Sequence, residues 1–198
     1  MSTQQSTDVL DRLAGIAAGS SLDALRHERP ETRRNVQASY EALFDAKDET
    51  GVSPAERFAV ASFVALLHGD GTSAQHYLQH LEQAEGDRLS TLVREQAKRA
   101  AARGPYGTYP PGPLSREDTD GPVLAIGIAD RAKLGERLTT ALEHAHRLVF
   151  HPRDAKAPDF AALQAAGWST AAIVTLSQIV AFLSFQIRAA HGLRVLGA

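Results

Sequence analysis

The stretch Ser53–His80, SPAERFAVASFVALLHGDGTSAQHYLQH, decides the fold that this sequence predicts. Ser53 precedes a proline and lies three residues before Glu56, a pattern in which the two side chains cap the start of a helix reciprocally. The residues that follow are apolar on nearly every side of the helix, which indicates burial on more than one face. Two glycines then favour a turn, and a second helix begins at about Thr72 or Ser73.

The rest of the sequence predicts further helices and no sheet, so the expected class is all-α. One apolar run, 123–128, could form a strand, but it has no partner strand, and we expect coil or the lead-in to a helix there. The other predicted helices are Asp8 to about Ala17, capped by Thr7; a short one through Leu22, Leu25 and His27; Glu31 to about Ala46; Asp87 to Arg99; about Ala129 to Phe150; a short one from Pro158 that Gly167 closes; and one capped by Ser169 that continues to about Leu196.

A proline- and glycine-rich segment divides the chain. Residues 104–123 contain five prolines and four glycines, a composition that disfavours helix and strand. Two tyrosines, Tyr106 and Tyr109, indicate that the segment packs on something, as a passive connector or as a lid over a pocket. We predict an N-terminal helical half at 1–103, a crossover at 104–128 and a C-terminal helical half at 129–198, the two halves packed as one domain.

Composition limits the function classes. The chain has 21 basic and 23 acidic side chains and a formal charge of −2, so it has no overall positive field for nucleic acid or anionic membrane. It has no cysteine, which excludes disulfides, thiolate metal sites and thiol redox chemistry. The start, MSTQQSTDVLDRL, lacks a basic region followed by an apolar one, so we expect no signal peptide and a cytoplasmic location.

One segment is long enough to raise the question of a membrane span. From Phe160 to Ile187 the sequence has no charged side chain. A glycine and a serine divide this segment, however, and polar side chains are spread along its second part, which lipid would penalise. We therefore expect the central buried helix of a soluble domain.

The opening stretch resembles the catalytic helix of the alkylhydroperoxidase and carboxymuconolactone decarboxylase superfamily. Redox members carry a glutamate, eleven residues, a cysteine, two residues, a second cysteine, three residues and a histidine. With Glu56 as the glutamate, the cysteines fall on His68 and Gly71, and the histidine falls on Gln75, one residue short of His76. Of this motif only the acid is present.

A shift of 116 residues relates the opening helix to the last one. It places Ser53 on Ser169, Val64-Ala65 on Val180-Ala181, Leu67 on Leu183 and His68 on Ser184. It also leaves the superfamily's glutamate in the first copy, at Glu56, and its histidine in the second, at His191. We predict two degenerate copies of one helical unit.

The tail is similar to the end of the two-part, peroxidase-related members of this superfamily. Those members have a Gly-aromatic-Ser turn before a long helix that ends in an arginine and a Gly-Leu pair, here Gly167-Trp168-Ser169, Arg188 and Gly192-Leu193. The resemblance covers roughly Val52 to Leu196. It implies an all-α fold built into symmetric homo-oligomers whose small active sites lie near subunit contacts.

The resemblance also implies a site. Peroxide reduction in the redox members uses two cysteines that this chain lacks, so thiol peroxidase activity is excluded. Decarboxylase-type members use acid–base groups instead, and whether this protein is an enzyme of that kind stays open. We predict no metal and no other cofactor. The candidate catalytic residues are Glu56, His68 and His191, and the candidate ligand-binding residues are Arg188, Ser184 and His76.

Several candidates also have a structural explanation. Glu56 can be only the capping partner of Ser53. His68 can be only a C-terminal cap, favoured by the helix dipole. His76 and His80 lie four residues apart on one helix face and could hold a metal, although the sequence shows no third ligand.

Other polar residues of the second half raise similar choices. Arg188 should find a carboxylate or carbonyl, and we expect the partner to be Glu56 or the acid group of a ligand. His144 and His146, two apart on a helix, are expected at the surface. A polar stripe recurs every seven residues and forms either a seam between helices or a pocket wall; its members are Thr170, Ser177, Ser184 and His191.

Two functions from different classes follow. The first is a cysteine-less relative that binds a small organic molecule between the repeat helices, with Glu/His acid–base turnover left open. The second is a non-catalytic structural or regulatory oligomer partner of a cysteine-containing relative. A bundle unrelated to this superfamily is the third interpretation, and it predicts that the 116-residue shift relates nothing in space.

Overall fold

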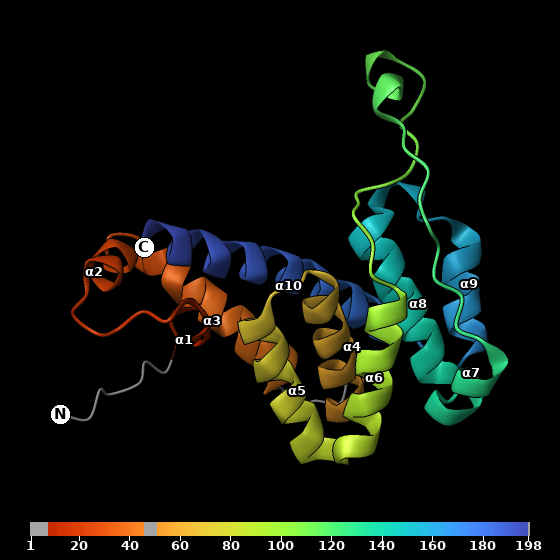
Figure 1. Cartoon of the computed structure of the whole chain (residues 1–198), viewed down its shortest axis with the longest axis horizontal. Helices are drawn as coiled ribbons and strands as arrows, with labels where there is room; N and C mark the ends of the chain where they lie inside the picture. The colour runs from red at the N-terminus through yellow and green to blue at the C-terminus, as the bar shows by residue number, and fades with distance from the viewer. Residues whose placement is uncertain (1–7, 46–50, 198) are drawn as a thin grey trace.

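The computed structural model describes residues 8–45 and 51–197, which form ten α-helices, two short 3₁₀ helices and no strand (Figure 1). The predicted all-α class is confirmed. The α-helices are α1 Val9–Ala14, α2 Ser21–His27, α3 Pro30–Phe44, α4 Pro54–Leu67, α5 Gly71–Glu85, α6 Asp87–Arg99, α7 Ile128–Leu134, α8 Glu136–Phe150, α9 Ala157–Ala165 and α10 Thr170–Leu196.

Helix α4 lies at the centre of the bundle. Every residue from Ala59 to Ala65 is fully buried, including the hydroxyl-bearing Ser62. Helices α5, α6, α8 and α10 pack around α4 (Figure 1). This arrangement explains why the helix is apolar on all sides, because each face meets a different neighbour.

The ends of α4 form as the local sequence predicts. Ser53 Oγ accepts from the Glu56 amide at 3.3 Å, and Glu56 Oε2 accepts from the Ser53 amide at 2.8 Å, which completes the capping box. Gly69, with a φ of 69°, turns the chain after α4. Asp70 then caps α5 by accepting from the Ser73 amide at 2.8 Å, so α5 leaves almost directly from the end of α4.

One predicted helix needs correction, and two predicted boundary residues cannot be compared with the structure. The helix expected at 129–150 is divided by Gly135, whose φ of 80° no helix interior adopts, into α7 and α8. Thr7, the expected cap of the first helix, and Ala46, the expected end of the helix that starts at Glu31, lie outside the described residues. The described cap of α1 is Asp8, which accepts from the Asp11 amide at 3.0 Å.

Helix α10 runs along one side of the whole bundle and packs against α1, α3, α4, α8 and α9 (Figure 1). It is long and apolar enough to cross a membrane, but half of its most apolar window is buried against the rest of the chain. A core helix of a soluble protein has the same composition, so this is weak evidence for a membrane span. One hydrophobic core cluster contains residues of both predicted halves, such as Phe63 and Leu183.

Residues 104–123 form an arm that projects from the bundle between α6 and α7 (Figure 1). An antiparallel bridge joins Gly107 to Thr119 across the two sides of the arm, with 2.8 Å from the Gly107 nitrogen to the Thr119 oxygen. A 3₁₀ helix, Pro113–Glu117, turns the chain at the end of the arm. The base is tied to α8 by the Tyr106 amide, which donates to the Phe150 carbonyl at 2.6 Å.

Candidate functional site

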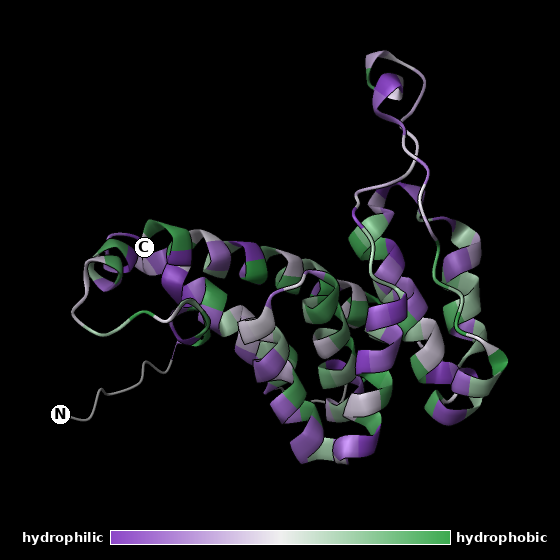
Figure 2. Ribbon diagram, in the orientation of Figure 1, coloured by the Kyte–Doolittle hydropathy of each residue, from purple (hydrophilic) through white to green (hydrophobic). Residues whose placement is uncertain are grey.

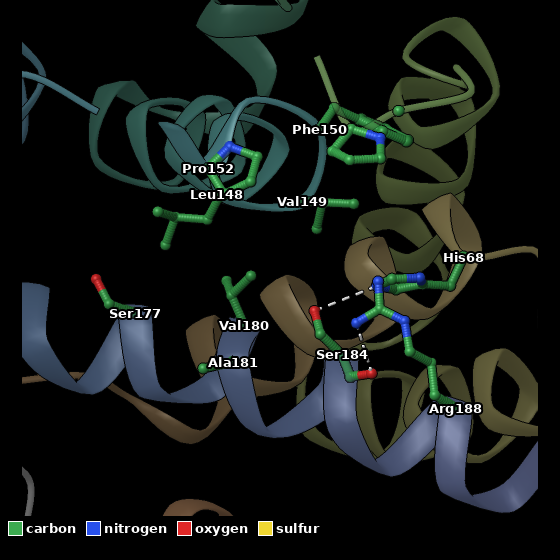
Figure 3. A pocket seen from close by; sticks show the side chains of 12 residues that line it. His68, Leu148, Val149, Phe150, Pro152, Ser177, Val180, Ala181, Ser184 and Arg188 are labelled. Carbon is green, nitrogen blue, oxygen red and sulfur yellow. Dashed lines mark hydrogen bonds between the residues drawn. The ribbon is translucent and has the colours of Figure 1, made fainter. Parts of the chain in front are cut away.

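A cavity of about 550 Å³ opens between α8, α10, the end of α4 and the base of the arm (Figure 3). Most of its wall is apolar. The apolar side chains around it include Pro105 from the arm, Leu148, Val149 and Phe150 from α8, and Val180 and Ala181 from α10. The polar lining residues are His68, Ser177, Ser184 and Arg188.

Three polar side chains gather at one end of the cavity (Figure 3). His68 Nε2 lies 3.3 Å from Ser184 Oγ. Arg188 Nη1 donates to the Ser184 carbonyl at a long 3.3 Å, and within the described ranges Arg188 has no carboxylate partner. The exposed guanidinium therefore stands beside the cavity with most of its hydrogen-bonding capacity open to a ligand or to solvent.

The imidazole of His68 is held in its neutral form. Burial lowers the pKa of His68, and the positive charge of Arg188 lowers it further, against the opposing effect of Asp70. A neutral imidazole can donate from one ring nitrogen and accept at the other. His68 does occupy the C-cap position of α4, but its ring is directed across the bundle to Ser184.

Ser177 marks the other polar end of the cavity. Its Oγ donates to the Ile173 carbonyl at 2.9 Å and lies 3.0 Å from His144 Nε2. His144 and His146 are 5% and 1% exposed, so the expectation of surface histidines is wrong. His144 contacts Ser177 of α10 and packs against Phe160 of α9, whereas His146 packs against Phe150 and His151 at the end of α8, so two side chains that point apart are both buried.

Glu56 lies outside this cavity. It is twelve residues from His68 on one helix, or about 18 Å along the axis. Its Oε1 accepts from Arg137 Nε at 2.6 Å, and its Oε2 accepts from the Ser53 amide. The arginine partner of Glu56 is thus Arg137, not Arg188, and both carboxylate oxygens are engaged in holding the start of α4.

Arg137 joins the starts of α4 and α10. Its Nη1 donates to the Gly167 carbonyl at 2.7 Å, and its Nη2 donates to the Gly51 carbonyl. The guanidinium carbon lies 3.7 Å from the centre of the Trp168 ring, whose Nε1 donates back to the Arg137 carbonyl at 2.9 Å. No motif in the sequence points to Arg137.

The two turns that Arg137 joins have the same local structure. Gly51 and Gly167 both have positive φ, 75° and 89°, and each is followed by a buried residue and a serine cap. Ser169 Oγ accepts from the Ala172 amide at 3.1 Å, as Ser53 does at its own helix. The 116-residue shift pairs these turns, and it also pairs His68 with Ser184, which touch. Beyond that point the likeness ends, because α10 continues where α4 stops.

His76 lies on α5, in an aromatic cluster away from the cavity. Its Nε2 is 3.1 Å from the Tyr40 hydroxyl, and its ring centre is 4.8 Å from that of His80. His80 stacks on Phe58 at 4.9 Å. Burial, with a smaller effect of His80, lowers the pKa of His76 to about 4. The described residues contain no group of three metal-ligating side chains around this pair.

The cavity therefore brings together three of the six predicted site residues: His68, Ser184 and Arg188. His191 is exposed on α10 and does not line the cavity. The predicted stripe is divided in the same way, because Ser177 and Ser184 form part of the wall while Thr170 and His191 do not. The pocket-wall interpretation therefore holds for the middle of the stripe, and the two ends of the stripe are exposed to solvent.

No protein-family model and no curated protein matches this chain.

Proposed function

We propose that this protein binds a small, mainly apolar molecule with one carboxylate group in the cavity beside His68. The observation that carries the proposal is an apolar cavity of about 550 Å³ with Arg188, His68 and Ser184 at one end. Small-molecule sites are typically about 300–1,000 Å³, apolar, and supplied with a few convergent polar groups.

Each part of such a ligand has a matching surface. The carboxylate would accept from Arg188 in a charge-assisted hydrogen bond, which this exposed guanidinium can form without breaking an ion pair to any residue in the described part of the chain. The neutral His68 and the Ser184 hydroxyl would supply further hydrogen bonds. The apolar body of the ligand would lie against α8 and α10, and its burial would supply most of the affinity.

The same geometry favours binding over turnover. Thiol chemistry is excluded because the chain has no cysteine. Glu56, the acid of the superfamily motif, is held by Arg137 and Ser53 at the far end of α4. His68 is the imidazole among the lining residues, burial lowers its pKa, and no carboxylate lines the cavity beside it. We infer that this protein is a cysteine-less relative of the alkylhydroperoxidase-like proteins. It has a ligand pocket but does not carry out their chemistry.

We further propose that α10 is a core helix of a cytoplasmic protein. Gln186, in the middle of α10, is fully buried and accepts from the Tyr77 hydroxyl of α5. Placing α10 in lipid would break this hydrogen bond and expose the buried face of α4.

The second candidate function is a structural or regulatory oligomer partner. It is favoured by large apolar side chains exposed along the outer side of α10, among them Val174 and Phe185. This function does not need an occupied cavity, so ligand binding separates the two.

The test is thermal melting of the purified protein with small aromatic and aliphatic carboxylates, their amides, lactones and hydroperoxides. A carboxylate at about one hundred times its Kd should raise the unfolding free energy by about 2.7 kcal/mol and the Tm by a few degrees, and its amide should not. Arg188→Gln should abolish the shift, and Arg88→Gln, an exposed arginine of α6, should preserve it. Equal shifts in both variants, or none in the wild type, would refute the proposal.

A further inference from the structure

The outer part of the arm, residues 110–120, is here called the arm tip. Figure 1 shows it well away from every helix of the bundle. Its hydrogen bonds are made within the arm: the Gly112 amide donates to Ser115 Oγ at 3.0 Å, and Asp118 Oδ1 accepts from the Tyr109 amide at 2.7 Å. Leu114 is 48% exposed, among three exposed prolines. The chain thus presents an ordered, proline-rich tip that its own bundle does not cover.

The arm is fixed in direction at its base. Arg153 lies over the Tyr109 ring at 4.1 Å and donates to the Tyr109 hydroxyl at 3.1 Å. The Tyr106 ring packs directly on Gly121, where a Cβ would overlap it. Asp154 also accepts from the Thr108 amide at 3.2 Å. These contacts order the arm before any partner arrives, which lowers the entropic cost of docking it.

A groove lies at the other end of the molecule, between α2, α3 and α10, here called the α2/α3/α10 groove. It has a volume of about 390 Å³ and an almost entirely apolar lining. Three of its large side chains are 44–70% exposed: Leu25, Phe185 and Leu196. Figure 2 shows hydrophobic residues on α2 and on the C-terminal part of α10, at the outer surface of the molecule.

The arm tip and the groove carry opposite charge. The arm tip has one basic residue, Arg116, and three acidic ones, Glu117, Asp118 and Asp120. The groove lining has two arginines and no carboxylate. Arg26 is paired with Asp8 and Asp11, but Arg29 has no ion pair within the described ranges, so it is the groove residue that can pair with a carboxylate of the arm tip.

We propose that the arm tip of one copy of this chain docks in the α2/α3/α10 groove of a second copy. Proline-rich segments bind apolar grooves well because they are already extended and lose little entropy. The groove and the arm lie at opposite ends of the bundle (Figure 1), so a chain cannot fill its own groove. Reciprocal docking of two copies gives a closed dimer with two equal contacts. This proposal goes beyond ligand binding and does not depend on it.

The test is the mass of the full-length protein in solution, by sedimentation equilibrium. At about 100 µM, a contact with a Kd near 1 µM would make the wild type mainly dimeric. Leu114→Glu in the arm tip and Phe185→Glu in the groove should each give a monomer. A mixture of the two variants should recover a dimer, because an intact arm and an intact groove can still form one contact. Ile128→Glu, at an apolar residue that is 88% exposed outside both surfaces, should stay dimeric.

Charge reversal provides a second test of the proposal. Arg29→Glu, and separately Glu117→Lys with Asp120→Lys, should each weaken dimerisation at least tenfold, and their combination in one chain should restore it. Glu85→Lys with Glu95→Lys is the matched control on exposed helix faces and should leave the dimer unchanged. A monomeric wild type would overturn the proposal. So would a Leu114→Glu variant as dimeric as the wild type, which would indicate pairing of α10 faces without the arm.

Discussion

His68 and Ser184 lie 3.3 Å apart, from Nε2 to Oγ, although 116 residues separate them in the chain. The contact closes one end of the apolar cavity and places a neutral imidazole, a hydroxyl and the Arg188 guanidinium side by side (Figure 3). The same interval relates the two glycine-serine turns at the starts of α4 and α10. The end of α4 and the middle of α10 thus meet at residues that the sequence shift also pairs.

Ser184→Ala should weaken carboxylate binding by about tenfold, the usual effect of losing one hydrogen bond of about 1–1.5 kcal/mol. Ser177→Ala is the matched control, because it lies on the same helix and lines the same cavity at its other end. It should leave the affinity within about twofold, although it removes the partner of His144 and lowers stability. Isothermal titration with the tightest carboxylate from the melting panel measures both. Equal losses would contradict the assignment of the polar end.

Carboxylate binding should strengthen as the pH falls below the ordinary pKa of histidine, 6.5. Burial and Arg188 lower the pKa of free His68, so the imidazole is neutral near pH 7 and gains a proton only at lower pH. A bound carboxylate stabilises the protonated form, and linkage requires that protonation then strengthens binding. Affinities measured between about pH 7 and pH 5.5 should rise in the wild type and stay level in His68→Gln. A parallel rise in the variant would assign the effect to another group.

The parts of the fold that depend only on residues close together in the sequence can be predicted from it. The capping box of Ser53 and Glu56 and the closing turn at Gly167 are local patterns, and the structure contains both. The break at Gly135 was missed because the apolar spacing continues across it and hides a single turn residue. The burial of His144 was missed because it depends on α9 and α10, which arrive from later in the sequence.

The candidate site likewise has one part that the sequence predicts and one part that it does not. His68, Ser184 and Arg188 share a cavity because α4 and α10 cross at that point, and the helical shift already paired the first two. Arg137 could not be found by a motif, since its partners lie 30 to 86 residues away and two of them are main-chain carbonyls. The sequence signal for Arg137 is the pair of matched glycine–serine turns. Each turn has a glycine carbonyl that accepts a hydrogen bond, and one arginine donates to both.

Glu56→Gln should lower the unfolding free energy by about 1–2 kcal/mol, because Arg137 would lose the charged partner of a half-buried pair. It should leave the ligand-induced melting shift unchanged, since Glu56 lies outside the cavity. Glu85→Gln, at an exposed residue, is the control and should have no effect on either quantity. Urea unfolding measures the first effect and the melting panel the second. Hydroperoxide turnover that Glu56→Gln abolishes would contradict this structural role.

Gly51→Ala and Gly167→Ala should each destabilise the protein by about 1 kcal/mol, because both residues adopt positive φ, which alanine disfavours. An added Cβ at either position meets no atom closer than 3.6 Å, so the cost comes from the backbone alone and should be similar. Gly127→Ala is the control, with a φ of −65° and open space around it. A cost confined to one of the two turns would argue against their equivalence.

The free energy of unfolding should fall as the pH is lowered from about 6.5 to about 4. Burial lowers the pKa of His76 to about 4, from an ordinary value of 6.5. In this window the unfolded chain binds a proton that the folded chain does not, so the folded state loses stability as the pH falls, by up to about 3 kcal/mol for a shift of this size.

His76→Phe should be less stable near pH 7, because Tyr40 loses its hydrogen-bond partner, yet it should lose less stability on acidification than the wild type. The exposed His191→Gln should follow the wild-type curve. Urea unfolding at about pH 7, 6, 5 and 4.5 measures these slopes, and an equally steep fall in His76→Phe would show that the acid sensitivity arises elsewhere.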